Sequence, residues 1–222
     1  MLDIFDILGP VMVGPSSSHT AGAVRIGRMA RTLLGGAPVK ADIGLYGSFA
    51  ETGRGHGTDR ALVAGLLGMH PDDLRIPQSF ELAGGQGLDF CIHPIQLREA
   101  HPNTVVLKLK RADGSELTLQ AASIGGGRIR VDKLNGVEVQ FTGDLNTLVV
   151  QHQDVAGKVA EETRELSNAG INIATMSLWR DRRGGDALIV IETDQKVPEA
   201  VRRKILELPG VKRLTYYEKE DD

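Results

Sequence analysis

The chain has 222 residues, of which 41% are hydrophobic and 25% are charged, an ordinary composition for a folded protein. This length fits two modest domains better than one. The net charge of -3 lacks the excess of lysine and arginine that nucleic acid or an anionic membrane surface requires, so we expect neither as a partner. No apolar run approaches the roughly 20 residues that span a bilayer.

The single cysteine, Cys91, excludes a disulfide within the chain. One cysteine is typical of a reducing compartment, and the acidic first residues are unlike a signal peptide, so we expect a cytoplasmic protein. Because iron–sulfur clusters usually take several thiolates, a cluster held wholly by this chain is excluded. Cys91 lies in an alternating pattern and is expected to be an ordinary buried thiol.

Residues 14–20, GPSSSHT, place four hydroxyls and an imidazole directly before the first helical pattern. Ser17 or Ser18 is expected to cap that helix. The other hydroxyls and the free amides would then face an anion such as a carboxylate or a phosphate. His19 would lie beside the anion, with a proton affinity suited to acid–base work near neutral pH. A serine-rich turn that only caps a helix is the alternative, but a histidine within the run favours a binding or catalytic site.

A helix is predicted after this motif, up to a stop at residues 35–36. Its second face carries Arg25, Arg28 and Arg31, which are expected to be solvated, although Arg25 is close enough to the helix start to reach an anion. Apolar and polar residues then alternate from 39 to 49, which predicts a strand with one buried face.

The predicted strand leads into a second loop with a histidine, in which His56 lies between two glycines. Loop histidines are often functional, and an exposed, idle histidine is the alternative. Thr58 or Asp59 is expected to cap the short helix that follows. Because this junction and the 14–20 motif both carry a histidine beside hydroxyls, they could converge on one ligand.

Beyond residue 71 the pattern is rich in strands. Asp113-Gly114 and Asn135-Gly136 predict hairpin turns. The glycine run at residues 125–127 predicts a bulge or a place where another backbone or a ligand comes close. The predicted strands are residues 88–92, 104–110, 117–124 and 129–141.

The remaining histidines are expected to be structural or solvated. No pair of them shows zinc-type spacing backed by a carboxylate or a cysteine, so no metal site is expected on this chain. A serine hydrolase is disfavoured, because the Gly-x-Ser-x-Gly motif is missing. The histidines in question are His70, His93, His101 and His152.

The second block begins near residue 144, so we expect domains at residues 1–143 and 144–222. Its predicted order of strand, helix, strand, strand, helix and strand implies a ferredoxin-like βαββαβ sandwich, and the fold class is α+β. A loop joins its first strand to its first helix, and small residues there leave helix amides open to a small carboxylate ligand. A plain connection is the alternative. The loop residues are Asp154, Val155, Ala156 and Gly157.

Four motifs of the first block resemble the β chains of the bacterial iron–sulfur-dependent L-serine dehydratases. The second block resembles the ACT regulatory domain that ends chains of this type, although Ala156 stands where its ligand loop usually has proline. The motifs are residues 6–10 (DILGP), 14–20 (GPSSSHT), 55–59 (GHGTD) and 123–127 (SIGGG).

The resemblance implies a lyase that converts L-serine to pyruvate and ammonia together with a separate α chain. The α chain would carry a [4Fe-4S] cluster that acts as a Lewis acid on the serine hydroxyl, while a base removes the α-proton. The first block would have the mixed α/β fold of an allosteric substrate-binding domain found in some phosphoglycerate dehydrogenases. The ACT domains would pair, giving an assembly of two α and two β chains.

The resemblance also implies roles for the residues of the 14–20 motif. Ser16, Ser17, Ser18 and Thr20 would bind the substrate carboxylate or contact the cluster region. Either His19 or His56 would be the base. A regulatory amino-acid sensor, in which the same loop is an allosteric serine site, and a stand-alone hydrolase remain as alternatives.

Overall fold

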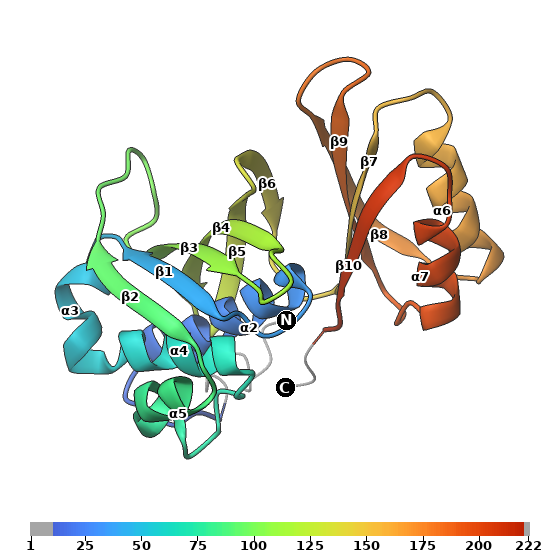
Figure 1. Ribbon diagram of the computed structural model, residues 1–222. Helices are drawn as coiled ribbons and strands as arrows, with labels where there is room; N and C mark the ends of the chain where they lie inside the picture. Colours follow the sequence, from blue (N-terminus) through green and yellow to red (C-terminus); the bar gives the residue numbers. More distant parts are fainter. Residues whose placement is uncertain (1–10, 220–222) are drawn as a thin grey trace. The chain divides into compact units, whose positions relative to one another are not determined.

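The computed structural model describes residues 11–219, apart from the side chain of Arg54, so the DILGP motif lies outside the described residues. Tertiary contacts divide the chain into two compact units, and the boundary along the chain falls between Gly136 and Val137 (Figure 1). No helix in the described part is both long and apolar enough to cross a membrane.

The first unit is built on a six-stranded sheet of order β2-β1-β3-β4-β5-β6. β1 pairs with β2 in parallel and with β3 in antiparallel fashion, so the sheet is mixed. This confirms the mixed α/β class expected for the first block. The strands are β1 (Lys40–Leu45), β2 (Asp89–Pro94), β3 (Thr104–Lys110), β4 (Glu116–Gly125), β5 (Arg128–Leu134) and β6 (Val137–Phe141).

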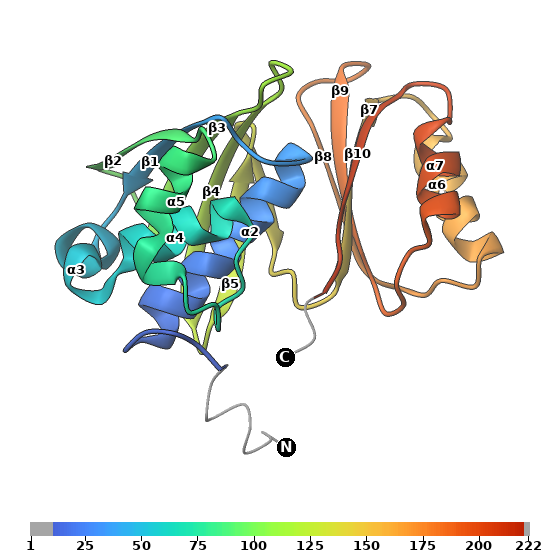
Figure 2. The same ribbon diagram turned by 60° about the horizontal axis from the view of Figure 1, so that its bottom comes forward.

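Helices α2, α4 and α5 gather on one face of this sheet (Figure 2). A π-helical turn, η1 (Ser17–Gly22), precedes α2, and a 3-10 turn, η2 (Ile76–Gln78), precedes α5. The core lies between helices and sheet, where Ile26, Leu62 and Leu107 are fully buried. The helices are α2 (Ala23–Leu34), α3 (Ser48–His56), α4 (Thr58–Leu67) and α5 (Ser79–Gly85).

Two of the arginines that were expected to be solvated instead bond to the end of α4. Arg28 Nη1 donates to Gly68 O at 2.7 Å, and Arg31 Nη1 donates to Leu66 O at 2.9 Å. Carbonyls at the end of a helix have no partner within the helix, and a cation there also complements the helix dipole. The helical pattern of α2 could not reveal these partners, because they lie about 40 residues further along the chain.

The region after β1 differs from the prediction. The strand ends at Leu45, and residues 48–56, expected to be strand and loop, form helix α3. Gly57, at φ 73°, then separates α3 from α4, and neither Thr58 nor Asp59 caps α4 through its side chain. Helix α5 was also missed, because its seven residues include two glycines and give no clear period.

The predicted hairpin turns are confirmed. Asp113-Gly114 lies between β3 and β4, and Asn135-Gly136 separates β5 from β6, with φ of 50° and 82°. The glycine run 125–127 turns β4 into β5, and Arg25 Nη1 donates to Gly127 O at 3.2 Å.

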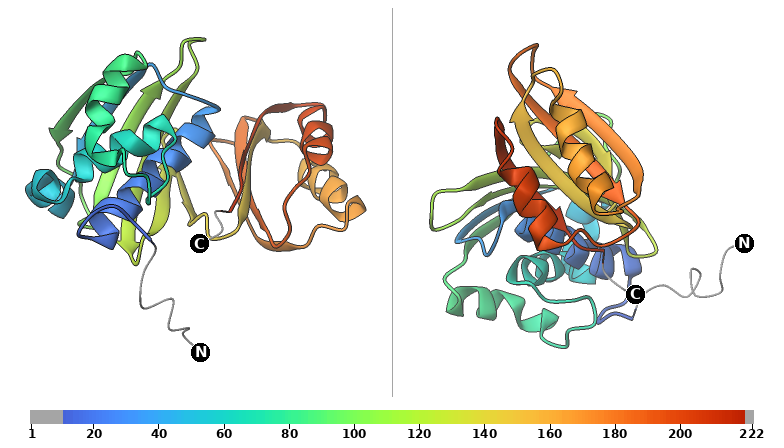
Figure 3. Two further views of the ribbon diagram at one scale, coloured as in Figure 1. Left: turned by 90° about the horizontal axis from the view of Figure 1, so that it is seen from below. Right: turned by 90° about the vertical axis from the view of Figure 1, so that its right-hand side faces the viewer.

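The second unit has a four-stranded sheet of order β10-β7-β9-β8, with α6 and α7 on one face (Figure 3). Its order of elements is βαββαβ, which confirms the ferredoxin-like prediction. β6 extends the first sheet, yet by its contacts it groups with the second unit, so the boundary after residue 143 stays a prediction. The elements are β7 (Asn146–Gln153), α6 (Lys158–Asn168), β8 (Ile173–Arg180), β9 (Asp186–Thr193), α7 (Glu199–Leu206) and β10 (Val211–Tyr217).

Candidate active site

Ser16 is the N-cap of the π-helical turn and adopts the extended conformation of a capping residue, with φ -142° and ψ 123°. Its Oγ accepts from the His19 amide at 3.3 Å, and its carbonyl accepts from the Thr20 amide at 2.8 Å. The expected cap, Ser17 or Ser18, is therefore wrong: both residues already lie inside the turn, half-buried. Single π turns within helices occur frequently at functional sites.

The imidazole of His19 is held by two hydroxyls from helix α3. His19 Nε2 lies 3.1 Å from Thr52 Oγ1 and 3.4 Å from Ser48 Oγ. Thr52 Oγ1 donates its only proton to Ser48 O at 2.8 Å, so it acts as an acceptor toward His19. Nε2 then carries the imidazole proton, and the lone pair of the neutral ring is on Nδ1, which lies 3.4 Å from Ser16 Oγ.

The second histidine lies beside the first. The ring centroids of His19 and His56 are 4.9 Å apart, and the rings are inclined by 64°. Phe49 contacts the His19 ring edge to face at 5.3 Å. The two segments that were expected to converge on one ligand thus meet at their histidines.

The surroundings of His19 favour its neutral form. Burial lowers its pKa below the usual 6.5, and the charge of His56 lowers it further, whereas a hydrogen bond with the Ser48 backbone acts in the opposite direction. A neutral imidazole at pH 7 can accept a proton, which is the state that a general base needs.

Four buried hydroxyls of the first unit, Thr20 Oγ1 on η1 among them, have no hydrogen-bond partner among the described residues. Ser123 contacts the backbone of η1 so closely that a Cβ on Gly22 would lie 2.1 Å from its Oγ. Buried polar groups are nearly always paired, so unpaired ones beside a candidate site point to a ligand or an ordered water. The four are Thr20, Thr58, Thr104 and Ser123.

Ser48 and Thr52 were missed at the level of the sequence, whereas His56 was among the expected site residues. Ser48, Thr52 and His56 follow one another at intervals of four, which places them on one face of a helix. That spacing was available in the sequence, but the alternating pattern of residues 39–49 favoured a strand there. Ser123 belongs to the 123–127 motif, but no local pattern predicted that β4 would bring it beside the π turn.

The loop of the second unit has a different geometry. Asp154 Oδ2 accepts from Arg180 Nη1 at 3.0 Å and from the Gly184 amide at 3.1 Å, and both bonds lower the pKa of this carboxyl. The carboxylate therefore ties the loop to the β8–β9 hairpin. Val155 is 47% exposed, and Gly157, at φ 90°, begins α6. Ligand binding by residues 154–157, Ala156 included, stays a prediction.

Cys91 is exposed, so the expectation of a buried thiol is wrong. The strand that carries it, β2, is the edge of the sheet, and Cys91 does not belong to the core beneath α2 and α4. One exposed thiol cannot supply the several thiolates of an iron–sulfur cluster. The residues of this chain thus do not fit a [4Fe-4S] cluster.

Comparison with known proteins gives two family matches along the chain. Residues 1–84 match the family described as serine dehydratase beta chain, and residues 146–210 match the ACT domain. The second match covers most of the βαββαβ unit.

Whole-chain relatives agree with these matches. A probable L-serine dehydratase beta chain of Bacillus subtilis is 41% identical over 96% of this chain and 96% of its own. The L-serine dehydratase beta chain of Peptoniphilus asaccharolyticus is 36% identical over 95% of this chain and 94% of its own. An L-serine dehydratase of Streptomyces coelicolor is 28% identical over 81% of this chain but only 45% of its own. Near-complete coverage in both directions at this identity shows that the chain belongs to the family of L-serine dehydratase beta chains.

Proposed function

We propose that this chain is the β subunit of an L-serine dehydratase, converting L-serine to pyruvate and ammonia with a separate α chain. The proposal is supported by the two relatives named beta chains, which match it from end to end. In the longer L-serine dehydratase of Streptomyces coelicolor, more than half of the protein lies outside the matched part. A second polypeptide would supply that part here.

The cluster expected for this family would belong to the α chain. This chain has one cysteine, which is exposed. We therefore assign the [4Fe-4S] ligands to the partner and restrict the role of this chain to substrate binding and proton transfer.

Within this chain, His19 is the proposed base that removes the α-proton, through Nδ1. The observation that carries this choice is that Ser48 and Thr52 hold the opposite nitrogen while burial and His56 keep the ring neutral. His56 is exposed and lies beside His19, so its proposed role is to support His19 rather than to accept the proton itself. His19 would accept the proton from the substrate carbon and would take no part in the departure of the substrate hydroxyl.

The substrate carboxylate is proposed to bind at the start of the π turn. The hydroxyls of Ser16, Ser17, Ser18 and Thr20 lie within five residues there, beside helix amides that favour an anion. Thr20 Oγ1 is buried and has no partner among the described residues, which suits a group that a ligand completes.

The test is pyruvate formation from L-serine by this chain alone, by the reconstituted α chain alone, and by both mixed anaerobically. Activity only in the mixture is expected. In the mixture His19→Gln should lower kcat by about 10²–10⁴-fold, the usual contribution of a positioned base. The control is His70→Gln, at an exposed histidine outside the site, which should leave kcat unchanged. An unchanged kcat in His19→Gln would rule out the catalytic role.

A regulatory subunit is the second candidate, favoured by the ACT match at residues 146–210. In that case the chain would sense an amino acid and the α chain would do all the chemistry. Full kcat from the α chain alone would support it against the first proposal. Under either proposal we place the protein in the cytoplasm and expect the ACT domains to pair, giving two α and two β chains.

A further inference from the structure

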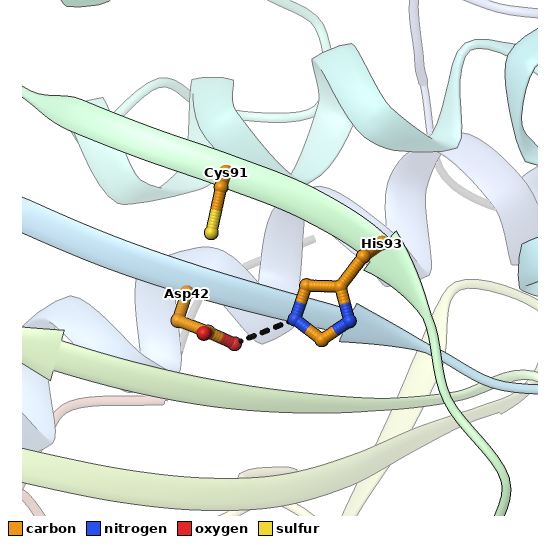
Figure 4. Close-up of side chains that lie close together, drawn as sticks. All are labelled: Asp42, Cys91 and His93. Atoms are coloured by element: carbon orange, nitrogen blue, oxygen red, sulfur yellow. Dashed lines mark hydrogen bonds and ion pairs between the residues drawn. The ribbon is translucent and has the colours of Figure 1, made fainter.

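A second group of reactive side chains lies on the edge of the first sheet, outside the site around His19. Asp42 on β1 pairs in register with Cys91 on the parallel strand β2, and His93 follows two residues later. Residues two apart on a strand share a face of the sheet. All three side chains therefore project from one face, as Figure 4 shows.

The three side chains are close enough to share one ion. His93 Nε2 lies 2.9 Å from Asp42 Oδ1, and the thiol, imidazole and carboxylate atoms all lie within 4.8 Å of one another. In a tetrahedral zinc site with bonds of roughly 2.0–2.3 Å, neighbouring ligand atoms are about 3.3–3.8 Å apart. Small side-chain rotations would bring the group to that spacing, and the ion would replace the proton now shared between His93 and Asp42.

We propose that Asp42, Cys91 and His93 form a binding site for Zn²⁺ or a similar borderline divalent ion. Thiolate, imidazole and carboxylate are the ligands that zinc takes in proteins, whereas Mg²⁺ and Ca²⁺ prefer oxygen alone. Three protein ligands leave the fourth tetrahedral position for water. Because all three residues are at least partly exposed, an ion can enter from solvent without a change in the fold.

A neighbouring group supports the orientation of the imidazole. His93 Nδ1 lies 3.4 Å from the carbonyl oxygen of Pro94, which can accept its proton. Metal-binding histidines usually donate their second nitrogen in this way, and the bond leaves Nε2 as the ligand. The nitrogen that faces Asp42 is thus the one that coordination requires.

One nearby positive charge disfavours binding of a cation at this site. Lys108 on β3 is the register partner of Asp42 on its other side, and its charge disfavours a proton on His93. The same charge would disfavour a bound cation, so the site is expected to bind less tightly than a closed structural zinc site. Removing that charge should tighten binding.

The experiment uses the full chain, reduced and freed of metal, and titrates it anaerobically with Co²⁺. A thiolate-to-cobalt charge-transfer band should appear and saturate at one ion per chain, and Zn²⁺ should displace it. Cys91→Ser should abolish the band. His93→Gln and Asp42→Asn should each weaken Co²⁺ binding by at least about tenfold, since even residues behind the ligands contribute 10–100-fold.

Matched control variants distinguish binding at this site from non-specific binding of metal elsewhere on the chain. Glu81→Gln, an exposed carboxylate on α5, and His70→Gln, an exposed histidine elsewhere, should leave the affinity unchanged. Lys108→Gln should strengthen binding. Circular dichroism checks that each variant is folded, which substitutions at exposed positions rarely prevent.

Two results would overturn the proposal. One is the absence of a thiolate band; the other is a band that His93→Gln and Asp42→Asn leave unchanged, which would mean that the thiol binds cobalt by itself. The readout does not involve serine or the α chain, so its outcome is independent of the proposed dehydratase function.

Discussion

The imidazole of His19 is contacted by side chains from two segments of the chain: Ser16 beside it, and Ser48, Thr52 and His56 on α3. Each of these contacts acts on the same ring. The hydroxyls orient the imidazole, whereas burial and the neighbouring His56 lower its pKa and so favour the neutral ring.

We predict that His19 titrates below its usual value of 6.5, followed through its imidazole proton resonances in NMR spectra. His56→Gln should raise that pKa, because a positive neighbour is removed. A pKa at or above 6.5 in the native chain would contradict the burial argument.

The same shift has a consequence for folding. Below about pH 6.5 the unfolded chain binds a proton at position 19 more readily than the folded chain does, so the free energy of unfolding falls as the pH is lowered through this window. In His19→Gln this part of the pH dependence should be missing. Urea unfolding at a series of pH values measures both.

At the scale of elements, α2 and α4 cross at two glycines. A Cβ on Gly65 would lie 2.2 Å from Val24 O, and one on Gly27 would lie 2.5 Å from Leu62 O. Backbones this close leave no room for any side chain. Because η1 continues directly into α2, the close packing of α2 on α4 also sets the position of the π turn.

Gly65→Ala is therefore expected to destabilise the chain although alanine favours helices. Forcing a methyl group into a packed contact typically costs about 1–3 kcal/mol. Gly84→Ala in α5 is the matched control, since nothing lies within 4 Å of its added Cβ. It should be neutral, or stabilising by up to about 1 kcal/mol. Urea unfolding followed by circular dichroism compares the two, and equal midpoints would contradict the close crossing.

For the molecule as a whole, the most exposed strand of the second unit is β8, at one edge of its sheet. Met176 and Leu178 are each 45% exposed there, and they pair in register with the buried Ile191 and Ile189. Paired residues point to the same face, so the apolar core of this unit continues to its edge. An apolar, unpaired edge strand is suited to pairing with a second copy.

We predict that the chain self-associates through this edge. Sedimentation should show a dimer of the isolated chain, and Leu178→Lys should shift it toward monomer, because a charge at a sheet edge opposes pairing. Lys204→Ala on the exposed side of α7 is a control that should leave the dimer intact. A monomeric native chain would contradict the prediction.

The sequence predicts those parts of the structure that depend on interactions between residues close together in the chain. The βαββαβ unit, helix α2 and the hairpin turns at residues 113–114 and 135–136 were predicted because helical period, alternation and turn residues act over a few positions. Helix α3 was missed, because its first residues continue the alternation of residues 39–49 and the glycines that follow are typical of a loop.

By itself, then, the sequence determined the family and the order of elements in the second unit, and it singled out His19 and its serine-rich turn as a candidate site. Only the tertiary structure decided which hydroxyls hold the imidazole and that Ser16 caps the turn. It alone brought Asp42 beside Cys91 and His93. The physical reason is that turns and periods are set by neighbours in the chain, whereas a site assembled across strands depends on pairing between residues about 50 positions apart, which no local pattern records.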